Sequence, residues 1–143
     1  MYTYPYPRPA LTVDAILLKE ENDELLLVQR AKEPYAGKWA LPGGFLETDE
    51  LLIDGCRREV EEETGLKVGA LRQFKTYDAV NRDPRGRTIS VVFYGTVAGN
   101  APVEGGDDAA RAEWFPVNDL PELAFDHELI LSEFFRYRKD PCF

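Results

Sequence analysis

The segment from Gly44 to Leu66 constrains the fold of this chain most, because it contains signals for the start and the end of one helix. Thr48 is a residue type that caps helix starts, and Asp49 and Glu50 suit the positive end of the helix dipole. Gly65 is the residue type that ends helices in a left-handed conformation. The sequence therefore predicts a helix of about four turns between Thr48 and Gly65.

Three glutamates near the end of this predicted helix share one face. At about 100° per residue, Glu62 lies about 60° and Glu63 about 40° around the helix from Glu59. An isolated acidic run is usually a solvated charged face, but like charges at this spacing destabilise a helix by roughly a few tenths of a kcal/mol per pair. A hard divalent cation removes that conflict, and Mg²⁺ is commonly bound by a few carboxylates together with substrate phosphates. The cluster therefore predicts a Mg²⁺ site, in which Mn²⁺ could substitute.

Two further features of the segment suit such a site. Arg58 is flanked by acids and can hold some of the carboxylates in fixed rotamers, with Glu50 about two turns earlier as one partner. Gly43 and Gly44 would let the backbone approach a metal or a phosphate closely. A carbonyl of this glycine loop could therefore be a metal ligand.

Apolar runs elsewhere in the chain predict the strands of a sheet. The expected strands are residues 11–18, 25–28, 38–41, 66–77, 88–98 and 112–115, and a second helix is expected at 126–139. The first two strands are expected to form a hairpin, and the third to lie at a sheet edge. Prolines at positions 5, 7 and 9 favour an extended N-terminal arm over residues 1–10. With 143 residues, the chain is expected to be a single domain spanning 1–143.

Composition limits the partners and the location. The formal net charge is −9, so no nucleic-acid partner is expected, and a phosphorylated substrate would need local arginines or bound cations. The first ten residues lack the features of a signal peptide, and no apolar run is long enough to span a bilayer, so a cytoplasmic protein without a membrane partner is expected. Cys56 is expected to be an inert buried thiol. The N-terminal arm could pack on a second subunit, which makes a homodimer a candidate.

The segment beginning at Gly44 resembles the Nudix box, G-x5-E-x7-R-E-U-x-E-E-x-G-U, in which U is aliphatic. Every specified position is present: Gly44, Glu50, Arg58, Glu59, Val60, Glu62, Glu63, Gly65 and Leu66. Nine fixed positions in 23 residues form a highly specific pattern, unlike a lone glycine motif. Residues 39–44 and 113–116 also resemble the entry loop and the late strand of Nudix hydrolases, so the resemblance spans most of the chain.

The resemblance implies a fold and a mechanism. The fold class is α/β, an α/β/α sandwich around a mixed β-sheet, in agreement with the predicted strands. Water would attack one phosphorus of a pyrophosphate while bound magnesium neutralises the oxygens. The implied metal ligands are Glu59, Glu63 and Glu62, with the carbonyl of Gly43 as a fourth, and Arg58 orients the carboxylates.

The general base has two candidate locations, because members of the family take it either from the box or from an acidic residue on a later loop. In this chain Asp107 and Asp108 precede the strand expected at 112–115, and Glu104 is a further option. Of these, Asp108 is the expected catalytic residue. The alternative is a solvated turn formed by Gly-Gly-Asp-Asp.

Substrate choice is expected to depend on the loop from Asn81 to Ser90. Arg82, Arg85 and Arg87 are concentrated there in an otherwise acidic chain, and guanidinium groups suit phosphate and ribose recognition. The loop resembles that of compact ADP-ribose pyrophosphatases, which split ADP-ribose into AMP and ribose 5-phosphate, and the stretch 124–131 resembles their terminal helix. The alternative is an exposed hairpin tip that balances the acidic surface.

Arg30 and Trp39 complete the predicted substrate-binding set. Trp39, like Tyr35 and Phe125, could stack on adenine, although aromatic residues at such positions usually pack in the core. His127 could contact substrate, but a capping or packed histidine near a helix start is the more common arrangement.

Two other functions use the same features. A pyrophosphohydrolase of modified nucleoside triphosphates would need the same box and a pocket for one base. An ADP-ribose-sensing transcription regulator is the non-enzymatic alternative. It is disfavoured because the box is complete and because such regulators carry a winged helix after the sensor domain, whereas this sequence stops soon after the predicted terminal helix.

Overall fold

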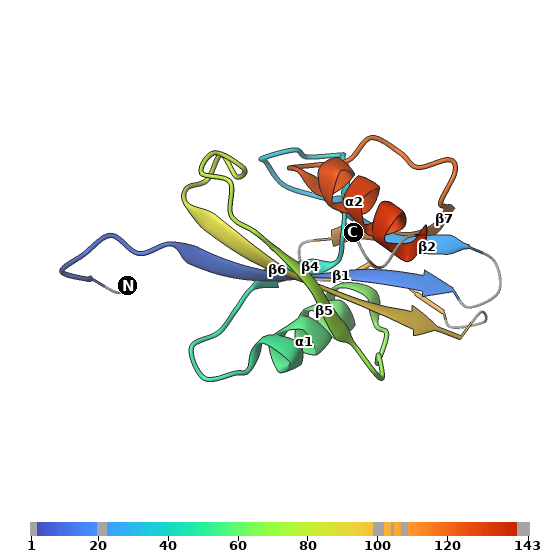
Figure 1. The fold of residues 1–143 in the computed structure, drawn as a ribbon, viewed down its shortest axis with the longest axis horizontal. Helices are drawn as coiled ribbons and strands as arrows, with labels where there is room; N and C mark the ends of the chain where they lie inside the picture. Colours follow the sequence, from blue (N-terminus) through green and yellow to red (C-terminus); the bar gives the residue numbers. More distant parts are fainter. Residues whose placement is uncertain (1–2, 20–22, 99–101, 104, 107–108, 140–143) are drawn as a thin grey trace.

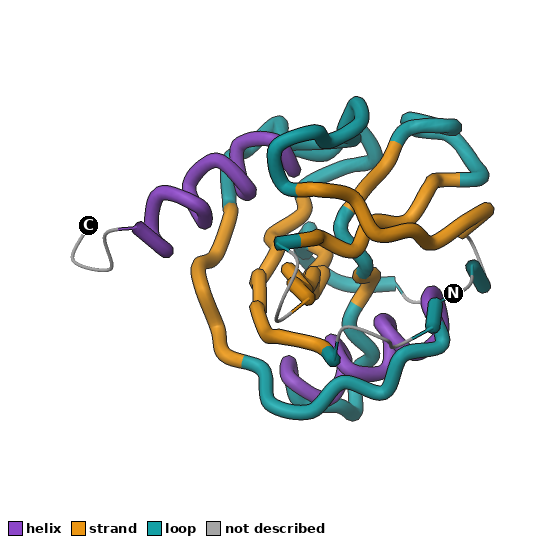
Figure 2. Tube along the Cα trace, turned by 90° about the vertical axis from the view of Figure 1, so that its right-hand side faces the viewer, coloured by secondary structure: helices purple, strands orange, loops and turns teal. Residues whose placement is uncertain are grey.

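The computed structural model describes residues 3–19, 23–98, 102–103, 105–106 and 109–139. A mixed β-sheet lies between two helices, one against each face (Figures 1 and 2). The elements are β1 Ala10–Lys19, β2 Glu24–Arg30, β3 Trp39–Ala40, β4 Gly43–Phe45, α1 Leu52–Thr64, β5 Arg72–Tyr77, β6 Thr88–Val97, β7 Ala109–Pro116 and α2 His127–Lys139. The predicted α/β/α sandwich is therefore confirmed.

The sheet is built around β1. Its strand order is β3-β2-β1-β6-β5, with β4 paired to β1 and β7 paired to β2. β1 and β6 run parallel over ten residue pairs, from Ala10 opposite Thr88 to Lys19 opposite Val97, whereas the other pairings are antiparallel. Leu18 pairs with Leu25, which confirms that β1 and β2 pair as a hairpin.

Alternation along β1 supplies both layers of the core. Val13, Ala15 and Leu17 belong to the cluster on the α1 side, where Val60 is also buried. Ile16 and Leu18 belong to the cluster that contains the buried α2 residues Ile130, Leu131 and Phe134. Successive side chains of a strand point to opposite faces, so one apolar run can hold a helix on each side.

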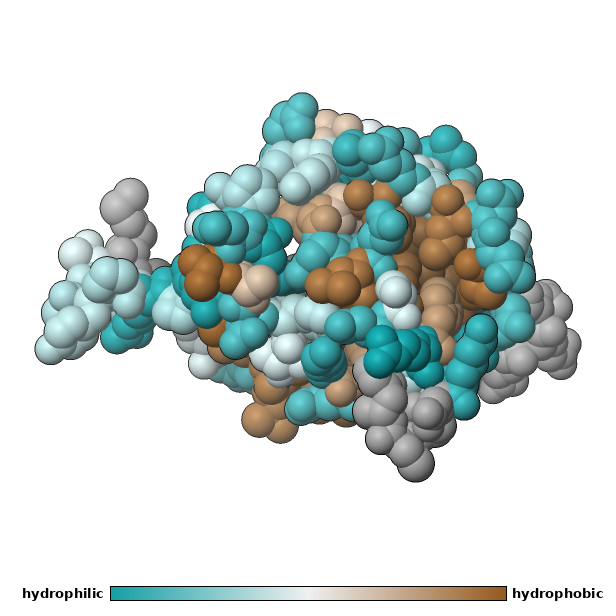
Figure 3. Space-filling model, turned by 45° about the horizontal axis from the view of Figure 1, so that its top comes forward, coloured by the Kyte–Doolittle hydropathy of each residue, from teal (hydrophilic) through white to brown (hydrophobic). Residues whose placement is uncertain are grey.

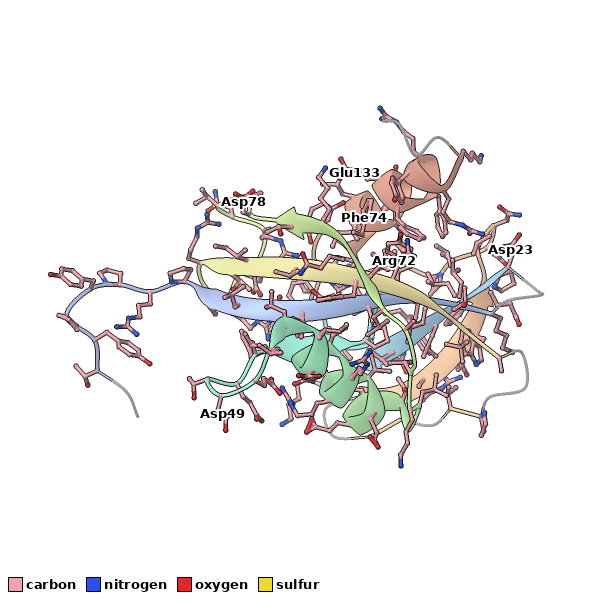
Figure 4. The ribbon with its side chains drawn as sticks, turned by 60° about the horizontal axis from the view of Figure 1, so that its bottom comes forward. Asp23, Asp49, Arg72, Phe74, Asp78 and Glu133 are labelled. Atoms are coloured by element: carbon pink, nitrogen blue, oxygen red, sulfur yellow. The ribbon has the colours of Figure 1, made fainter. Side chains whose placement is uncertain are left out.

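Aromatic contacts attach α2 to the sheet. Phe74 of β5 packs edge-on against Phe134, with ring centroids 5.3 Å apart. Beside it, the Tyr77 hydroxyl donates a 2.7 Å hydrogen bond to Glu133 of α2. Figure 4 shows Phe74 and Glu133 next to each other at this junction. These contacts hold the middle of α2 against β5.

The start of α1 differs from the predicted start. The helix begins at Leu52, and its N-cap position is Leu51, which makes no side-chain capping bond. Thr48 lies in a turn before the helix, and Asp49 extends from the same loop (Figure 4). The predicted cap is wrong because the Glu50 carboxylate closes this turn by accepting a 2.9 Å bond from the backbone N–H of Glu47.

Other boundaries also differ from the predicted ones. β5 begins at Arg72 instead of residue 66, and β7 is longer than predicted. β4 was not predicted, because Gly43 and Gly44 are typical of loops, yet they pair with β1. Residues 3–9 form no helix or strand and extend away from the sheet (Figure 1).

Cys56 is buried, and burial raises the pKa of its thiol to about 12, as expected for an unreactive cysteine.

Within the described part of the chain, neither helix has the length and apolar character needed to cross a membrane.

A groove separates α2 from the segment that follows β7. Val117, Leu120, Leu123, Leu131 and Phe135 are among its lining residues. Figure 3, which turns this side toward the viewer, shows apolar side chains gathered between polar ones.

We predict that Gly65→Ala lowers the free energy of unfolding by about 1 kcal/mol. Gly65 ends α1 with φ +77°, and its added Cβ would meet no atom within 4 Å, so the cost comes from backbone strain. Urea unfolding measures the change. Gly69→Ala is the matched control, because Gly69 has the same open surroundings without a left-handed φ. Equal losses in both variants would contradict the prediction.

Candidate active site

A cavity of about 410 Å³ opens at the end of the sheet where β4 meets α1. On one side it is lined by the acidic face of α1 and the glycines of β4. On the other side it is lined by the loop before β6 and the start of α2. The lining residues include Asp14, Arg30, Gly43, Gly44, Phe45, Arg58, Glu59, Glu62, Glu63, Arg82, Asp83, Arg85, Phe125 and His127.

The three glutamates on α1 reach this cavity together. Glu59, Glu62 and Glu63 all line it, while Val60 and Thr64 on the other side of the helix are fully buried. The periodicity predicted from the sequence therefore describes the real helix. The charged face lies along the cavity wall because the apolar face of α1 is packed against the sheet.

Arg58 connects the carboxylates. Its Nε and Nη2 donate to the two oxygens of Glu50 at 2.9 and 2.8 Å. Its Nη1 donates to Glu59 at 2.9 Å and to Glu62 at 2.7 Å. The predicted ion pairs are present, and the guanidinium neutralises part of a dense negative charge.

This network shifts several pKa values. The hydrogen bonds from Arg58 lower the pKa of Glu50 to about 2, and the same contacts raise the pKa of Arg58. Burial raises the pKa of Glu59, although Arg58 opposes the change. Glu59 is thus a carboxylate whose negative charge is incompletely compensated by its surroundings, which favours binding of a cation.

The glycines of β4 allow the chain to lie directly against the acidic helix. The backbone N–H of Gly43 donates a 2.8 Å bond to Glu63. A Cβ on Gly44 would lie 2.5 Å from the Glu59 carboxylate, and one on Gly43 would clash with the Val13 carbonyl and the Asp14 side chain. The absence of a side chain at these two glycines therefore lets β4 lie directly against β1 and the Glu59 carboxylate. The predicted approach to a metal or a phosphate stays a prediction.

The donor set fits a hard divalent cation. Glu59, Glu62, Glu63 and the backbone of Gly43 offer oxygen atoms, which Mg²⁺ prefers. In the part of the chain that the structure describes, however, no three acidic, His or Cys side chains converge closely enough to hold an ion by themselves. Arg58 and the Gly43 amide instead bind the carboxylates. Waters and substrate phosphates commonly complete a Mg²⁺ shell, so a partial protein set is compatible with one.

The arginine loop reaches the cavity with two of its three arginines. Arg82 makes a two-point ion pair with Asp126, at 2.9 and 2.7 Å, and its side chain is only 4% exposed. Arg85 is held by Asp83, and hydrogen bonds from Arg85 keep the pKa of Asp83 below its ordinary value even though burial opposes this. Arg87 lies outside the cavity lining and donates to the backbone carbonyl of Asp78.

Arg85 lies between two aromatic rings at the cavity. Its guanidinium carbon is 4.9 Å from the Phe45 ring centroid and 5.1 Å from that of Phe125. Arg30 approaches the same Phe125 ring at 5.0 Å, and its Nε donates to the Pro34 carbonyl at 2.7 Å. The cavity therefore combines cationic and aromatic surfaces opposite its acidic wall.

Of the predicted aromatic contacts, only Phe125 lines the cavity. Trp39 is buried, packs edge-on against Phe115 at 4.8 Å, and does not belong to the lining. Tyr35 packs against Phe125 from behind, with ring centroids 4.9 Å apart.

The cavity floor contains residues that the sequence did not single out as a group. Asp14 and His127 are buried and line the cavity, and the Ser90 hydroxyl donates to Asp14. Burial raises the pKa of Asp14 and lowers that of His127. The sequence did contain one indication of this site, because Asp14 is a charged residue within the apolar run of β1. Ser90 and His127, however, lie far from Asp14 in the chain.

The later acidic loop is only partly described. Asp107, Asp108 and Glu104 lie outside the described residues. Their neighbour Gly106 packs so closely on the Glu62 carbonyl that a Cβ there would clash. Gly106 thus lies next to the end of α1.

Residues 8–137 match the family model described as the NUDIX domain. The chain is 43% identical to an ADP-ribose pyrophosphatase of Methanocaldococcus jannaschii over 133 residues, which cover 93% of this chain and 77% of that protein. It is 33% identical to the ADPR responsive transcriptional repressor NtrR of Acinetobacter baylyi, covering 91% of this chain but 54% of the repressor.

Solved structures agree with this picture. The NUDIX domain of Shewanella oneidensis NrtR, complexed with ADP ribose, superimposes with a TM-score of 0.86 at 28% identity and covers 95% of this chain and 94% of that domain. A bifunctional NMN adenylyltransferase/ADP ribose pyrophosphatase from Francisella tularensis gives a TM-score of 0.83 at 32% identity, covering 93% of this chain and 42% of the other.

The sheet between two helices, with a carboxylate-lined cavity at its end, defines an α/β protein whose acidic site suits a divalent cation and phosphate groups. The chain belongs to the Nudix family and is a Nudix hydrolase.

We predict that the Glu50–Arg58 pair makes stability depend on pH in the acid range. The pKa of Glu50 falls from its ordinary 4.5 to about 2 in the folded chain, so its contribution to stability is complete above pH 4.5 and is lost as the pH falls toward 2. The free energy of unfolding, measured by denaturant titration across this range, should decline less steeply in Glu50→Gln than in the parent. Parallel pH profiles would contradict the prediction.

Proposed function

We propose that this Nudix hydrolase cleaves the pyrophosphate bond of a nucleoside diphosphate linked to another group, with ADP-ribose, split into AMP and ribose 5-phosphate, as its foremost substrate. The observation that carries the proposal is the pairing of two surfaces in one cavity: the acidic face of α1 and the aromatic and cationic surface around Arg85. The named pyrophosphatase relative and the ADP-ribose-bound NUDIX domain support this choice.

Magnesium is the proposed cofactor, and manganese a substitute. Glu59, Glu62, Glu63 and the Gly43 carbonyl would hold it. When bound, the cation neutralises charge on the pyrophosphate oxygens and stabilises the leaving phosphate. Arg58 keeps Glu59 and Glu62 oriented toward the cavity, and the Gly43 amide does the same for Glu63.

The attacking water needs a base, for which the chain offers two locations. A box glutamate could accept the proton. Asp108 on the later loop, with Asp107 and Glu104 nearby in the sequence, is the other candidate. The position of Gly106 beside the Glu62 carbonyl supports including this loop.

On the opposite wall, Arg85 is suited to binding the charged or aromatic parts of a nucleotide. A guanidinium can stack on a base and pair with phosphate oxygens, and Asp83 holds this one in a fixed position. Arg30 lies beside the Phe125 ring, which Arg85 also contacts. Arg85, Arg30 and the aromatic rings would bind the nucleotide, and the glutamates of α1 would hold the cation at the pyrophosphate.

Sensing of ADP-ribose without cleavage is the second candidate function. The 33% identity to a transcriptional repressor favours it. The complete set of box glutamates, all lining one cavity, favours hydrolysis instead.

A substrate panel tests the proposal. Purified protein is incubated with ADP-ribose, other nucleotide sugars and nucleoside triphosphates, with and without magnesium. Phosphate is measured after phosphatase treatment for the nucleotide sugars, and after inorganic pyrophosphatase treatment for the triphosphates. Magnesium-dependent cleavage of ADP-ribose in preference to triphosphates is the expected result. Preference for a triphosphate would select a nucleotide pyrophosphohydrolase, and binding of ADP-ribose without turnover would select a sensor.

We predict that Glu63→Gln lowers kcat by at least about 100-fold while the protein stays folded, because the change removes a ligand charge but keeps the side-chain shape and helix propensity. Steady-state kinetics with magnesium and a thermal melt measure the two effects. Glu61→Gln is the control, since Glu61 is exposed on α1 outside the cavity lining. Unchanged magnesium-dependent turnover in Glu63→Gln would remove Glu63 from the metal site.

We predict that Arg85→Ala raises the KM for ADP-ribose by about tenfold, the effect of losing roughly 1.4 kcal/mol of binding. The increase for a nucleoside triphosphate should be smaller. Arg72→Ala serves as the control, because Arg72 is an exposed arginine on β5 away from the cavity lining (Figure 4). Equal increases for both substrates in Arg85→Ala would argue against a role in selecting ADP-ribose.

A further inference from the structure

The cavity floor carries a polar group that the proposed cleavage chemistry does not use. Asp14 lies on β1 and Ser90 on β6, and His127 begins α2. Asp14 is 7% exposed and His127 4%, yet both line the cavity that holds the glutamates. Burying polar side chains costs free energy unless they are hydrogen-bonded, so their contacts indicate what they can still bind.

His127 has one nitrogen committed to the fold. The backbone N–H of Leu41 donates a 3.0 Å hydrogen bond to its Nδ1. A ring nitrogen that accepts a hydrogen bond carries no proton of its own, so the remaining ring hydrogen is on Nε2. His127 is therefore a neutral, fixed hydrogen-bond donor at the cavity floor.

Asp14 supplies acceptors next to the glycine loop. Its Oδ2 accepts the hydrogen bond from the Ser90 hydroxyl. Its Oδ1 lies against Gly43, where a Cβ would clash with it. A carboxylate oxygen has more than one acceptor position, so Asp14 can accept further hydrogen bonds while Ser90 keeps it oriented.

This pair complements a hydroxyl group better than a phosphate. A hydroxyl both donates and accepts, which matches an acidic acceptor beside a neutral donor, and carboxylates commonly bind ribose hydroxyls. A phosphate oxygen would meet the Asp14 carboxylate without a cation to offset it. The nearby Arg82 is already bound at two points by Asp126.

We infer that Asp14 and His127 form a subsite for the hydroxyl groups of a sugar ring next to the pyrophosphate. If the second sugar occupies it, the subsite favours a sugar-linked diphosphate over a nucleoside triphosphate. The inference rests on the proposed function. The sugar can be the nucleoside ribose or the second group, and the chemistry of recognition is the same for both.

Two substitutions of His127 separate its contacts. In His127→Asn the side-chain oxygen can replace Nδ1 as the acceptor for Leu41, but no donor remains at the Nε2 position. In His127→Gln the amide can reach the Nε2 position, but the Leu41 amide loses its partner. A specificity role predicts that the Asn variant loses sugar binding while it keeps its thermal stability, whereas a purely structural role predicts greater damage in the Gln variant.

Binding is measured by calorimetry with magnesium for methyl phosphate, ribose 5-phosphate, AMP and 2′,3′-dideoxy-AMP. We expect His127→Asn to weaken at least one sugar phosphate by about tenfold relative to methyl phosphate, the effect of one lost hydrogen bond to a bound hydroxyl. A selective loss for ribose 5-phosphate identifies the second sugar. A selective loss for AMP, absent for dideoxy-AMP, identifies the nucleoside ribose. Equal losses for all four ligands, or none, would overturn the subsite.

Asp14→Asn repeats the measurement from the acceptor side, and it carries the test if His127→Asn does not fold. Asp54→Asn, on the exposed surface of α1, is its control. Turnover then separates the two proposals. If the parent protein does not cleave ADP-ribose, the proposed function fails, and the binding data still decide the subsite. If the parent cleaves ADP-ribose and the variants lose no selectivity for any sugar, the subsite fails and the function stands.

Discussion

The site depends on the balance of charge around Arg58. One guanidinium contacts Glu50, Glu59 and Glu62, so a helix that would otherwise carry several unopposed negative charges can pack against the sheet. The same contacts preset the directions of the carboxylates. Glu50 binds two of the guanidinium nitrogens from outside the helix, so Arg58 has an anchor besides Glu59 and Glu62.

The parallel pairing of β1 with β6 places the second half of the site. It brings Ser90 beside Asp14 and leads the preceding loop, with Arg82 and Arg85, to the cavity. β4 pairs with the other edge of β1 and sets the glycines against α1. A single central strand therefore aligns groups from four parts of the chain.

Local patterns made the acidic wall predictable. The spacing of the glutamates, the partner of Arg58 and the left-handed Gly65 all depend on residues within about two helical turns, where periodicity is informative. The cap at Thr48 failed because Glu50 closes the preceding turn with its own carboxylate. The bond between the Glu47 backbone and the Glu50 carboxylate competes with capping by Thr48. The helix-capping preference of a single residue type does not include such a contact.

Contacts between distant residues were not predictable in the same way. The hydrogen bond between Leu41 and His127 joins residues 86 positions apart, and the Asp14–Ser90 bond joins residues 76 apart. The residues around each of these four positions do not indicate which distant residue it contacts. For Trp39 the residue type was misleading. An aromatic side chain suggested a substrate contact, but Trp39 packs against Phe115 and is part of the core.

The ion pair between Arg82 and Asp126 has a consequence for how selectivity can change in this scaffold. It joins the loop before β6 to the residue before α2, and its arginine is almost fully buried. Removing one partner of a buried pair costs about 3 kcal/mol or more, because the other charge is left uncompensated. A loop grafted from a relative would thus require its matching helix start. The two segments form one exchangeable unit for redesign, although 44 positions separate them in the chain.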